Sequence, residues 1–201
     1  MNEMTEAQKL EMEIFEKTQN LAALRQAEEG TEVEDYTFQT AHGEIQLSDL
    51  FAGRDRLMLI HNMGQGCRYC TLWADGINGV LDHLEDAMAV ALVSKDAPKL
   101  QRRMALDRGW KFQLASHGGG KYMDEQCSMG EHINYPGANI YAREGGKIMR
   151  RGQTMFGPGD LYSPVWHFLS LAGIGMSDWT PQYHYWSRPQ NMDDGGENIR
   201  D

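Results

Sequence analysis

The sequence predicts an α/β protein built on a central mixed sheet that is flanked by helices. One observation behind this prediction is a strand–helix–strand order. Residues 57–60 are apolar and predict a strand, apolar residues recur at helical spacing between residues 67 and 88, and residues 87–93 form a second apolar strand. Such a unit closes as a right-handed parallel crossover. A second observation is the hairpin pattern of residues 138–142 and 147–151 around a glycine turn. The chain has 201 residues, 41% of them hydrophobic, which is enough for one substantial core.

A helical arm is expected before the globular body, over residues 1–32. Residues 5–29 form one amphipathic pattern, in which Thr5 and Gln8 have the spacing of a capping box and Gly30 is expected to end the helix. Five apolar residues return at helical spacing and are expected to form a buried stripe: Ala7, Leu10, Ile14, Leu21 and Leu24. The arm either packs on the body or mediates a homodimer.

The globular body is expected over residues 33–175. Its further predicted elements are a hairpin over residues 36–47, a helix from residue 96 to Gly109, a short strand over residues 112–115 and a helix over residues 165–172. The glycine-rich segment 117–134 has no pattern that assigns an element. Residues 176–201 are expected to form an extension that is aromatic up to Trp186 and disordered from Asn191. Its aromatic part either docks on its own domain, covers the cysteine pair or forms a subunit contact.

The charge pattern excludes several classes of partner. The formal charge of −10 comes from the two chain ends, because residues 36–189 hold 15 acids and 15 bases. No basic stripe indicates nucleic-acid binding. The longest apolar run has seven residues, whereas a membrane span needs about 20. The N-terminus lacks the pattern of a secretory signal, so the expected location is the cytoplasm, without membrane attachment and without a cofactor.

Two cysteines carry the chemistry that the sequence predicts. Cys67 and Cys70 follow the first apolar strand and lie in the first turn of the predicted helix. A thiol attacks as its thiolate, which the positive end of a helix stabilises, and Arg68 adds a neighbouring cation. Cys67 is therefore the better-placed nucleophile, and Cys70, one turn further in, can attack a mixed disulfide on Cys67. The spacing predicts a redox-active disulfide.

Two other interpretations of the pair stay open. A Cys-x-x-Cys motif is also half of many metal sites. The alternative function is therefore a copper-binding or zinc-binding protein that uses Cys67 and Cys70 with His61. No second such pair exists, and Cys127 and His132 lack ribbon-like spacing. The two thiols could also be inert, and a lone Cys127 is most simply a small buried hydrophobic residue.

Three segments carry a resemblance to a known family. They are the strand at residues 57–60, the run from Gly66 to Gly76 that contains both cysteines, and Tyr135-Pro136-Gly137 before the second hairpin. Together they resemble the thioredoxin fold over residues 33–175. More narrowly, they are similar to an uncharacterised bacterial thioredoxin-like family that is related to the alkyl hydroperoxide reductase and thiol-specific antioxidant branch of this fold.

The resemblance implies roles for individual residues. Cys67 would be the attacking thiol and Cys70 the resolving thiol of a thiol–disulfide oxidoreductase. Pro136 would match the cis-proline that faces the cysteine pair in this fold, and with Gly137 it would bind the partner's backbone. Arg68 and Tyr69, between the cysteines, complete the implied substrate-binding set. The implied partner is a protein or a small molecule that carries a thiol or disulfide.

The sequence also departs from the patterns of related families. Thioredoxins have tryptophan before the first cysteine and proline before the second, and here these positions hold Gly66 and Tyr69. The Pro-x-x-x-Thr/Ser-x-x-Cys signature of peroxiredoxins is missing, since Ile60 and Gly64 occupy its first two defined positions. His61 falls where thioredoxins hold a buried carboxylate that helps to move protons. A histidine can do this at neutral pH, although a lone histidine at a strand end is more often a hydrogen-bonded structural residue.

Overall fold

The structure of the protein is a computed structural model in which residues 3–183 and residue 185 are described. The disorder predicted from Asn191 onward lies outside the described residues. Within them, no helix combines the length and the apolar character that crossing a membrane requires.

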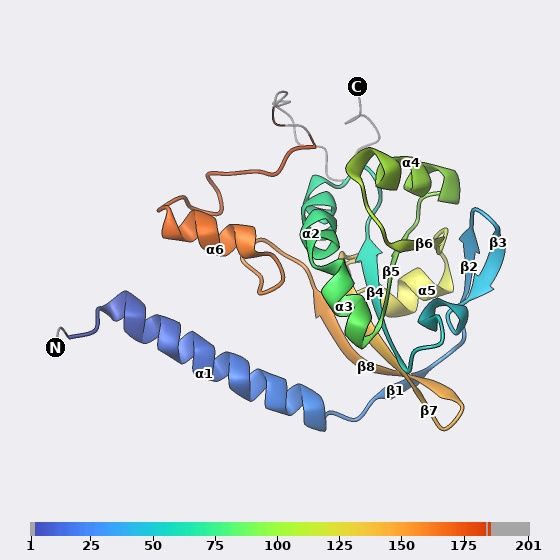
Figure 1. Cartoon of the computed structure of the whole chain (residues 1–201), viewed down its shortest axis with the longest axis horizontal. Coiled ribbons are helices and arrows are strands. Elements are labelled where there is room, and N and C mark those ends of the chain that lie inside the picture. The colour runs from blue at the N-terminus through green and yellow to red at the C-terminus, as the bar shows by residue number, and fades with distance from the viewer. Residues whose placement is uncertain (1–2, 184, 186–201) are drawn as a thin grey trace.

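One mixed sheet forms the centre of the molecule, with helices on both of its sides (Figure 1). Its strands are β1 (Thr31–Val33), β2 (Thr37–Thr40), β3 (Gly43–Gln46), β4 (Arg56–Asn62), β5 (Ala89–Ser94), β6 (Gln113–Ser116), β7 (Gly137–Glu144) and β8 (Lys147–Met155). The helices are α1 (Glu6–Ala27), α2 (Arg68–Gly79), α3 (Leu81–Ala87), α4 (Pro98–Arg108), α5 (Lys121–Gln126) and α6 (Pro164–Leu171), with a short 3-10 turn at Asp49–Phe51. The strand order is β1-β8-β7-β4-β5-β6-β2-β3.

The pairing of the strands confirms both kinds of predicted unit. β4, β5 and β6 are parallel to one another, and α2 and α3 connect β4 to β5. The hairpins β2–β3 and β7–β8 are antiparallel. The single helix predicted from residue 67 to residue 88 is wrong in one respect, because Val80 leaves helical geometry and separates α2 from α3. Asn78 and Gly79, just before the break, are weak helix formers.

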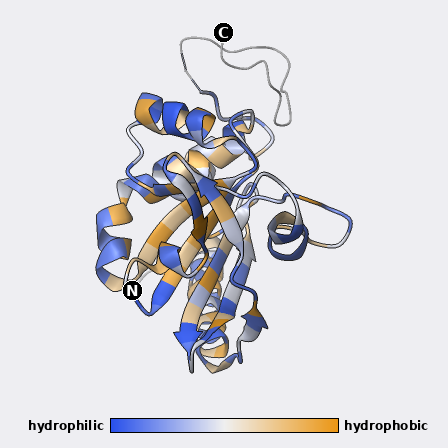
Figure 2. Ribbon diagram, turned by 90° about the vertical axis from the view of Figure 1, so that its right-hand side faces the viewer, coloured by the Kyte–Doolittle hydropathy of each residue, from blue (hydrophilic) through white to orange (hydrophobic). Residues whose placement is uncertain are grey.

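β4 and β5 have a hydrophobic core on each side, because successive side chains of a strand point to opposite faces. On one side, which we call the α5 face, Leu59 of β4 packs in a cluster with Tyr122 of α5. On the other side, the α2 face, Ile60 packs in a cluster with Trp73 of α2 and Trp166 of α6. Figure 2 shows the hydrophobic residues concentrated on the strands inside the molecule. The α5 helix lies in the segment to which the sequence pattern assigned no element.

The N-terminal arm differs from its prediction. The helix and its Thr5–Gln8 capping box are confirmed, but α1 extends away from the sheet and has no buried residue, so the predicted buried stripe is wrong (Figure 1). Among the described residues, the hydrophobic clusters on the α5 face and the α2 face contain no residue of α1. The helix ends at Ala27, and Gly30 has a different role from the predicted helix stop. A Cβ on Gly30 would lie 2.8 Å from the Arg151 side chain, so the glycine allows β1 to approach β8.

Candidate functional site

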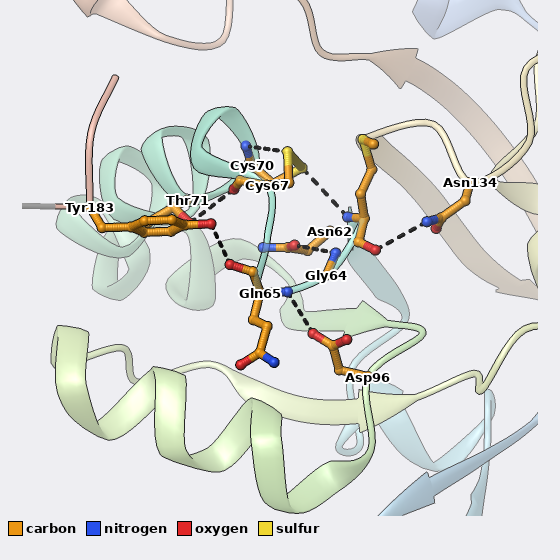
Figure 3. The surroundings of a disulfide bond; sticks show 10 residues. Asn62, Gly64, Gln65, Cys67, Cys70, Thr71, Asp96, Asn134 and Tyr183 are labelled. Carbon is orange, nitrogen blue, oxygen red and sulfur yellow. Dashed lines mark hydrogen bonds between the residues drawn. A yellow bond between two sulfur atoms is a disulfide. The ribbon is translucent and has the colours of Figure 1, made fainter. Parts of the chain in front are cut away.

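Cys67 and Cys70 lie where a short loop leaves β4 and enters α2 (Figure 3). Cys67 is the N-cap of α2, and its sulfur accepts a hydrogen bond from the N–H of Cys70 at 3.1 Å. The two cysteines form a disulfide, with their Cα atoms 5.3 Å apart. The sulfur of Cys67 therefore occupies the position where the unpaired N–H groups and the dipole of a helix favour negative charge.

The loop over residues 63–66 is held by hydrogen bonds to its neighbours (Figure 3). The N–H of Gly64 donates to the Asn62 side chain at 2.9 Å, and the N–H of Gln65 donates to the Asp96 carboxylate at 2.6 Å. Gly64 has a φ of +135°, and a Cβ there would lie 3.1 Å from that carboxylate, so the position needs glycine. The N–H of Cys67 donates back to the Gly64 carbonyl at 3.0 Å.

Two segments from later in the chain also hold this loop. The side-chain amide of Asn134 donates to the Met63 carbonyl at 3.1 Å. The Tyr183 hydroxyl donates to the Gln65 carbonyl, and Tyr183 itself is buried. The described aromatic part of the C-terminal extension thus docks on its own domain, which is one of its predicted arrangements. The loop before the cysteines is consequently held by side chains from three other segments, which contain Asp96, Asn134 and Tyr183.

A pocket of about 510 Å³ opens beside Cys67. Its walls are formed by Met63, Cys67, Arg68, Tyr69, Trp73, Glu131, His132, Ile133, Asn134, Tyr135, Pro136, Phe156, Gly157 and Pro158. Cys67 keeps 7% of its surface exposed and Cys70 keeps 3%. Of the two cysteines, only Cys67, at the helix start, is a wall residue of the pocket as far as the described residues show. Four of the predicted site residues meet there, namely Cys67, Arg68, Tyr69 and Pro136.

Arg68 and Tyr69 differ in what they offer to the pocket. Arg68 is only 2% exposed, and its guanidinium donates to the side-chain oxygen of Gln182 at 2.7 Å. The C-terminal extension therefore binds the cation that the sequence places next to Cys67. The Tyr69 ring stacks on Trp166, with 6.2 Å between the ring centroids. Tyr69 thus contributes an aromatic surface to one wall.

The prediction of a cis peptide bond before Pro136 is wrong, because the Tyr135–Pro136 bond is trans. The trans form is favoured by about 0.5–1 kcal/mol unless tertiary contacts select the cis form. Here the Pro136 carbonyl accepts a hydrogen bond from the N–H of Phe156 at 2.8 Å, and β7 begins at the next residue. Gly137 is buried in β7 between its partners in β4 and β8, and it is not a wall residue of the pocket. The predicted binding of a partner's backbone by Gly137 has no support in this position.

His61 lies on the α5 face, away from the side of β4 on which Ile60 packs against α2. Its Nδ1 atom lies 3.0 Å from the sulfur of Cys127, and its Nε2 atom lies 3.3 Å from the Tyr122 hydroxyl. Burial lowers the pKa of His61 to about 3, with smaller contributions from the charges of His117 and Arg150. Within the described residues, no hydrogen bond joins His61 to Cys67 or Cys70. The structural interpretation of His61 is therefore favoured over the predicted proton transfer.

A buried polar network continues from this pair, and the sequence patterns did not reveal it. The Tyr122 hydroxyl lies 3.5 Å from that of Tyr141, which donates to the Gln126 side chain at 3.1 Å. Gln126 in turn donates to the Tyr36 hydroxyl at 2.9 Å, and Tyr36 donates to Glu125 at 2.5 Å. Burial raises the pKa of Tyr122 and of Tyr141. The members come from distant parts of the chain, so no local motif could have indicated the network.

The three ligands predicted for the alternative metal site do not come together. His61 contacts Cys127 and Tyr122 on the α5 face, whereas Cys67 and Cys70 lie at the start of α2. Over residues 3–183 and 185, no three His, Cys, Asp or Glu side chains are grouped so that they could hold a metal ion. The geometry therefore gives no support to metal binding by Cys67, Cys70 and His61.

Comparisons with known proteins address the family and the fold. A family model described as "Bacterial protein of unknown function (DUF899)" matches residues 2–192. No curated protein matches the chain. Among solved structures, the chain is similar to reduced Prx3 in complex with H2O2 from Vibrio vulnificus, with a TM-score of 0.51 and 12% identity over 72% of this chain and 96% of that one. It is also similar to a mutant of Xanthomonas campestris peroxiredoxin Q, with a TM-score of 0.53 and 14% identity over 69% of this chain and 89% of that one. The fold is thioredoxin-like, as the sequence resemblance implied.

Proposed function

The chain belongs to the bacterial DUF899 family, and from this premise and the geometry of its cysteines we propose that it is a thiol–disulfide oxidoreductase. One observation carries the proposal: Cys67 caps the start of α2, is joined to Cys70 in a disulfide and borders an open pocket. In a thioredoxin-like fold, this placement of the two cysteines would combine a stabilised sulfur anion at Cys67, a second thiol within reach at Cys70 and access for a substrate through the pocket.

In the proposed reaction the reduced protein attacks a substrate disulfide. The Cys67 thiolate, stabilised by the N–H of Cys70 and by the helix start, displaces one substrate thiol and forms a mixed disulfide. Cys70 then attacks the Cys67 sulfur and releases the second thiol. The N–H of Met63 lies 3.5 Å from the Cys70 sulfur and would support the Cys70 thiolate in this step. The Cys67–Cys70 disulfide is the product, and an external dithiol returns the protein to its reduced form.

Substitution of each cysteine tests the proposal. The protein is reduced, exposed to a disulfide substrate, alkylated and analysed by mass spectrometry. We expect a reversible Cys67–Cys70 disulfide in the unmodified chain and in Cys127→Ser, which is the matched control. Cys67→Ser should abolish turnover, whereas Cys70→Ser should accumulate the mixed disulfide on Cys67. Failure to form the disulfide, or equal partial activity in the two variants, would contradict the proposal.

A further inference from the structure

We infer that the substrate of Cys67 is a small, apolar organic disulfide that enters the pocket beside this residue, and not an extended stretch of protein. The inference rests on the proposed thiol–disulfide chemistry and adds the chemical class of the substrate. Three features carry the inference. They are the internal hydrogen bonds of the backbone beside Cys67, the apolar chemistry of the pocket walls, and the contacts that hold these walls in place.

The backbone beside Cys67 is already hydrogen-bonded within the protein. An extended peptide is usually recognised by backbone hydrogen bonds to an exposed chain edge. Here the N–H of Tyr135 donates to the Cys127 carbonyl at 2.6 Å, and the Pro136 carbonyl accepts from Phe156 at 2.8 Å. Gly137 is paired on both sides, with β4 and with β8. To a substrate, this segment therefore offers the surface of its side chains more than free backbone groups.

The walls of the pocket are predominantly aromatic and aliphatic. Tyr69, Trp73, Tyr135 and Phe156 contribute rings, and Ile133 contributes a branched side chain at the mouth. The volume of about 510 Å³ falls within the roughly 300–1,000 Å³ of pockets that bind small molecules. Apolar walls bind a ligand by removing its apolar surface from water. A disulfide with an aromatic or branched substituent fits this chemistry.

Contacts on both sides hold the pocket in shape. The ring of Trp73 stacks on Phe156, with centroids 5.5 Å apart and an interplanar angle of 19°. Across the pocket, Asn134 has a φ of +58° and ties its segment to the Met63 carbonyl of the cysteine loop. Asparagine tolerates this left-handed conformation better than most residues do. The wall that carries Ile133 is thus bound to the loop that delivers Cys67, and Ile133 remains 63% exposed for a ligand to cover.

The inferred reaction is balanced in atoms and electrons. For a substrate R–S–S–R′, the Cys67 thiolate forms a bond to the sulfur of R, and the S–S bond breaks to release R′–S⁻, which takes up a proton. The Cys70 thiolate then bonds to the Cys67 sulfur and releases R–S⁻, which is also protonated. The substrate gains two electrons, and the protein loses the same two in forming its disulfide.

Three disulfides that share one leaving group test the inference. The reduced protein is mixed with benzyl 2-hydroxyethyl disulfide, with bis(2-hydroxyethyl) disulfide, or with an unstructured peptide whose cysteine carries the same 2-hydroxyethyl group. Acid quenching, alkylation and mass spectrometry give the rate of Cys67–Cys70 disulfide formation, and each rate is divided by the rate with dithiothreitol. We expect the benzyl compound to be at least about tenfold faster than the other two.

The outcomes separate this inference from the proposed function. Equal corrected rates, or the highest rate with the peptide, would overturn the small apolar substrate and leave the oxidoreductase in place. A protein that reacts with none of the three faster than the free dithiol does would overturn both.

A matched pair of variants adds a control within the same loop. Ile133 borders the pocket, whereas Met129 is 50% exposed and is not a wall residue. Ile133→Ser should lower the benzyl rate about tenfold more than it lowers the bis(2-hydroxyethyl) rate, because the benzyl group depends more on the apolar wall. Met129→Ser should change neither rate. An unchanged benzyl rate in Ile133→Ser, or an equal loss with both substrates, would overturn the inference.

Discussion

The two faces of β4 place cysteines in opposite chemical environments. On the α2 face, Cys67 lies at the start of a helix and borders a pocket. On the α5 face, Cys127 is 1% exposed, and burial raises its pKa. A helix start favours the thiolate, whereas a buried site without a charge partner favours the neutral thiol. We therefore expect the position of each cysteine in the fold to set its reactivity.

The same contrast shows that a short cysteine–histidine distance is not sufficient for activation. Cys127 and His61 are 3.0 Å apart, which is within the range of a nucleophile and its base. Burial, however, lowers the pKa of His61 and raises that of Cys127, so both groups stay neutral near pH 7. The pair belongs to a structural network, while Cys67, at the start of α2, carries the proposed chemistry.

The largest expected effect is the difference between the alkylation rates of Cys67 on the α2 face and Cys127 on the α5 face. After reduction at pH 7, iodoacetamide should modify Cys67 at least about 100-fold faster than Cys127, because the thiolate at a helix start is favoured and Cys127 is buried. Timed quenching followed by peptide mass spectrometry measures both rates. In denaturant the two rates should converge. Similar rates in the folded protein would remove the contrast.

A smaller effect is expected in the pH dependence of stability. The pKa of His61 is about 3 in the folded protein and near 6.5 when unfolded, so the unfolded chain binds one more proton between these values. The contribution of His61 is complete above pH 6.5 and is lost as the pH falls towards 3. From pH 7 to pH 5 this amounts to a loss of about 2 kcal/mol.

Urea unfolding at pH 7 and at pH 5 checks this expectation. His61→Gln removes the titrating group, and its free energy of unfolding should fall less between the two pH values than that of the unmodified chain. His117, whose pKa burial lowers to about 4, is present in both proteins and serves as the internal reference. Identical pH dependence would show that His61 is not held neutral by burial.

The smallest expected effect is that of one hydroxyl on the α5 face. Tyr122→Phe removes the group that contacts His61 and Tyr141, and it should cost about 1 kcal/mol of stability. The rate of disulfide formation at Cys67 should stay unchanged, since Tyr122 does not border the pocket. Thermal unfolding and the thiol-exchange assay measure the two quantities. A slower exchange would show that the two faces are coupled.

Local sequence patterns predicted those features whose physical cause lies within a few residues of the chain. The run of apolar residues in β4, the cysteine spacing and the helical period that follows predicted the strand, the helix start and the paired thiols. The buried stripe of α1 was predicted wrongly, because an amphipathic pattern says that a face can be buried and not that a partner is present. Likewise, the peptide bond before Pro136 depends on contacts with residues far along the chain.

The amino-acid order alone determined the strand–helix–strand unit, the two hairpins and the placement of Cys67 and Cys70 at a helix start, since these follow from spacings of a few residues. Only the tertiary structure decided that His61 meets Cys127, that the Ile133 segment walls the pocket and that the C-terminal extension binds Arg68. Each of these contacts joins residues more than 60 positions apart. Burial and pairing across such separations depend on how the sheet brings its segments together, and short-range sequence patterns do not indicate these long-range contacts.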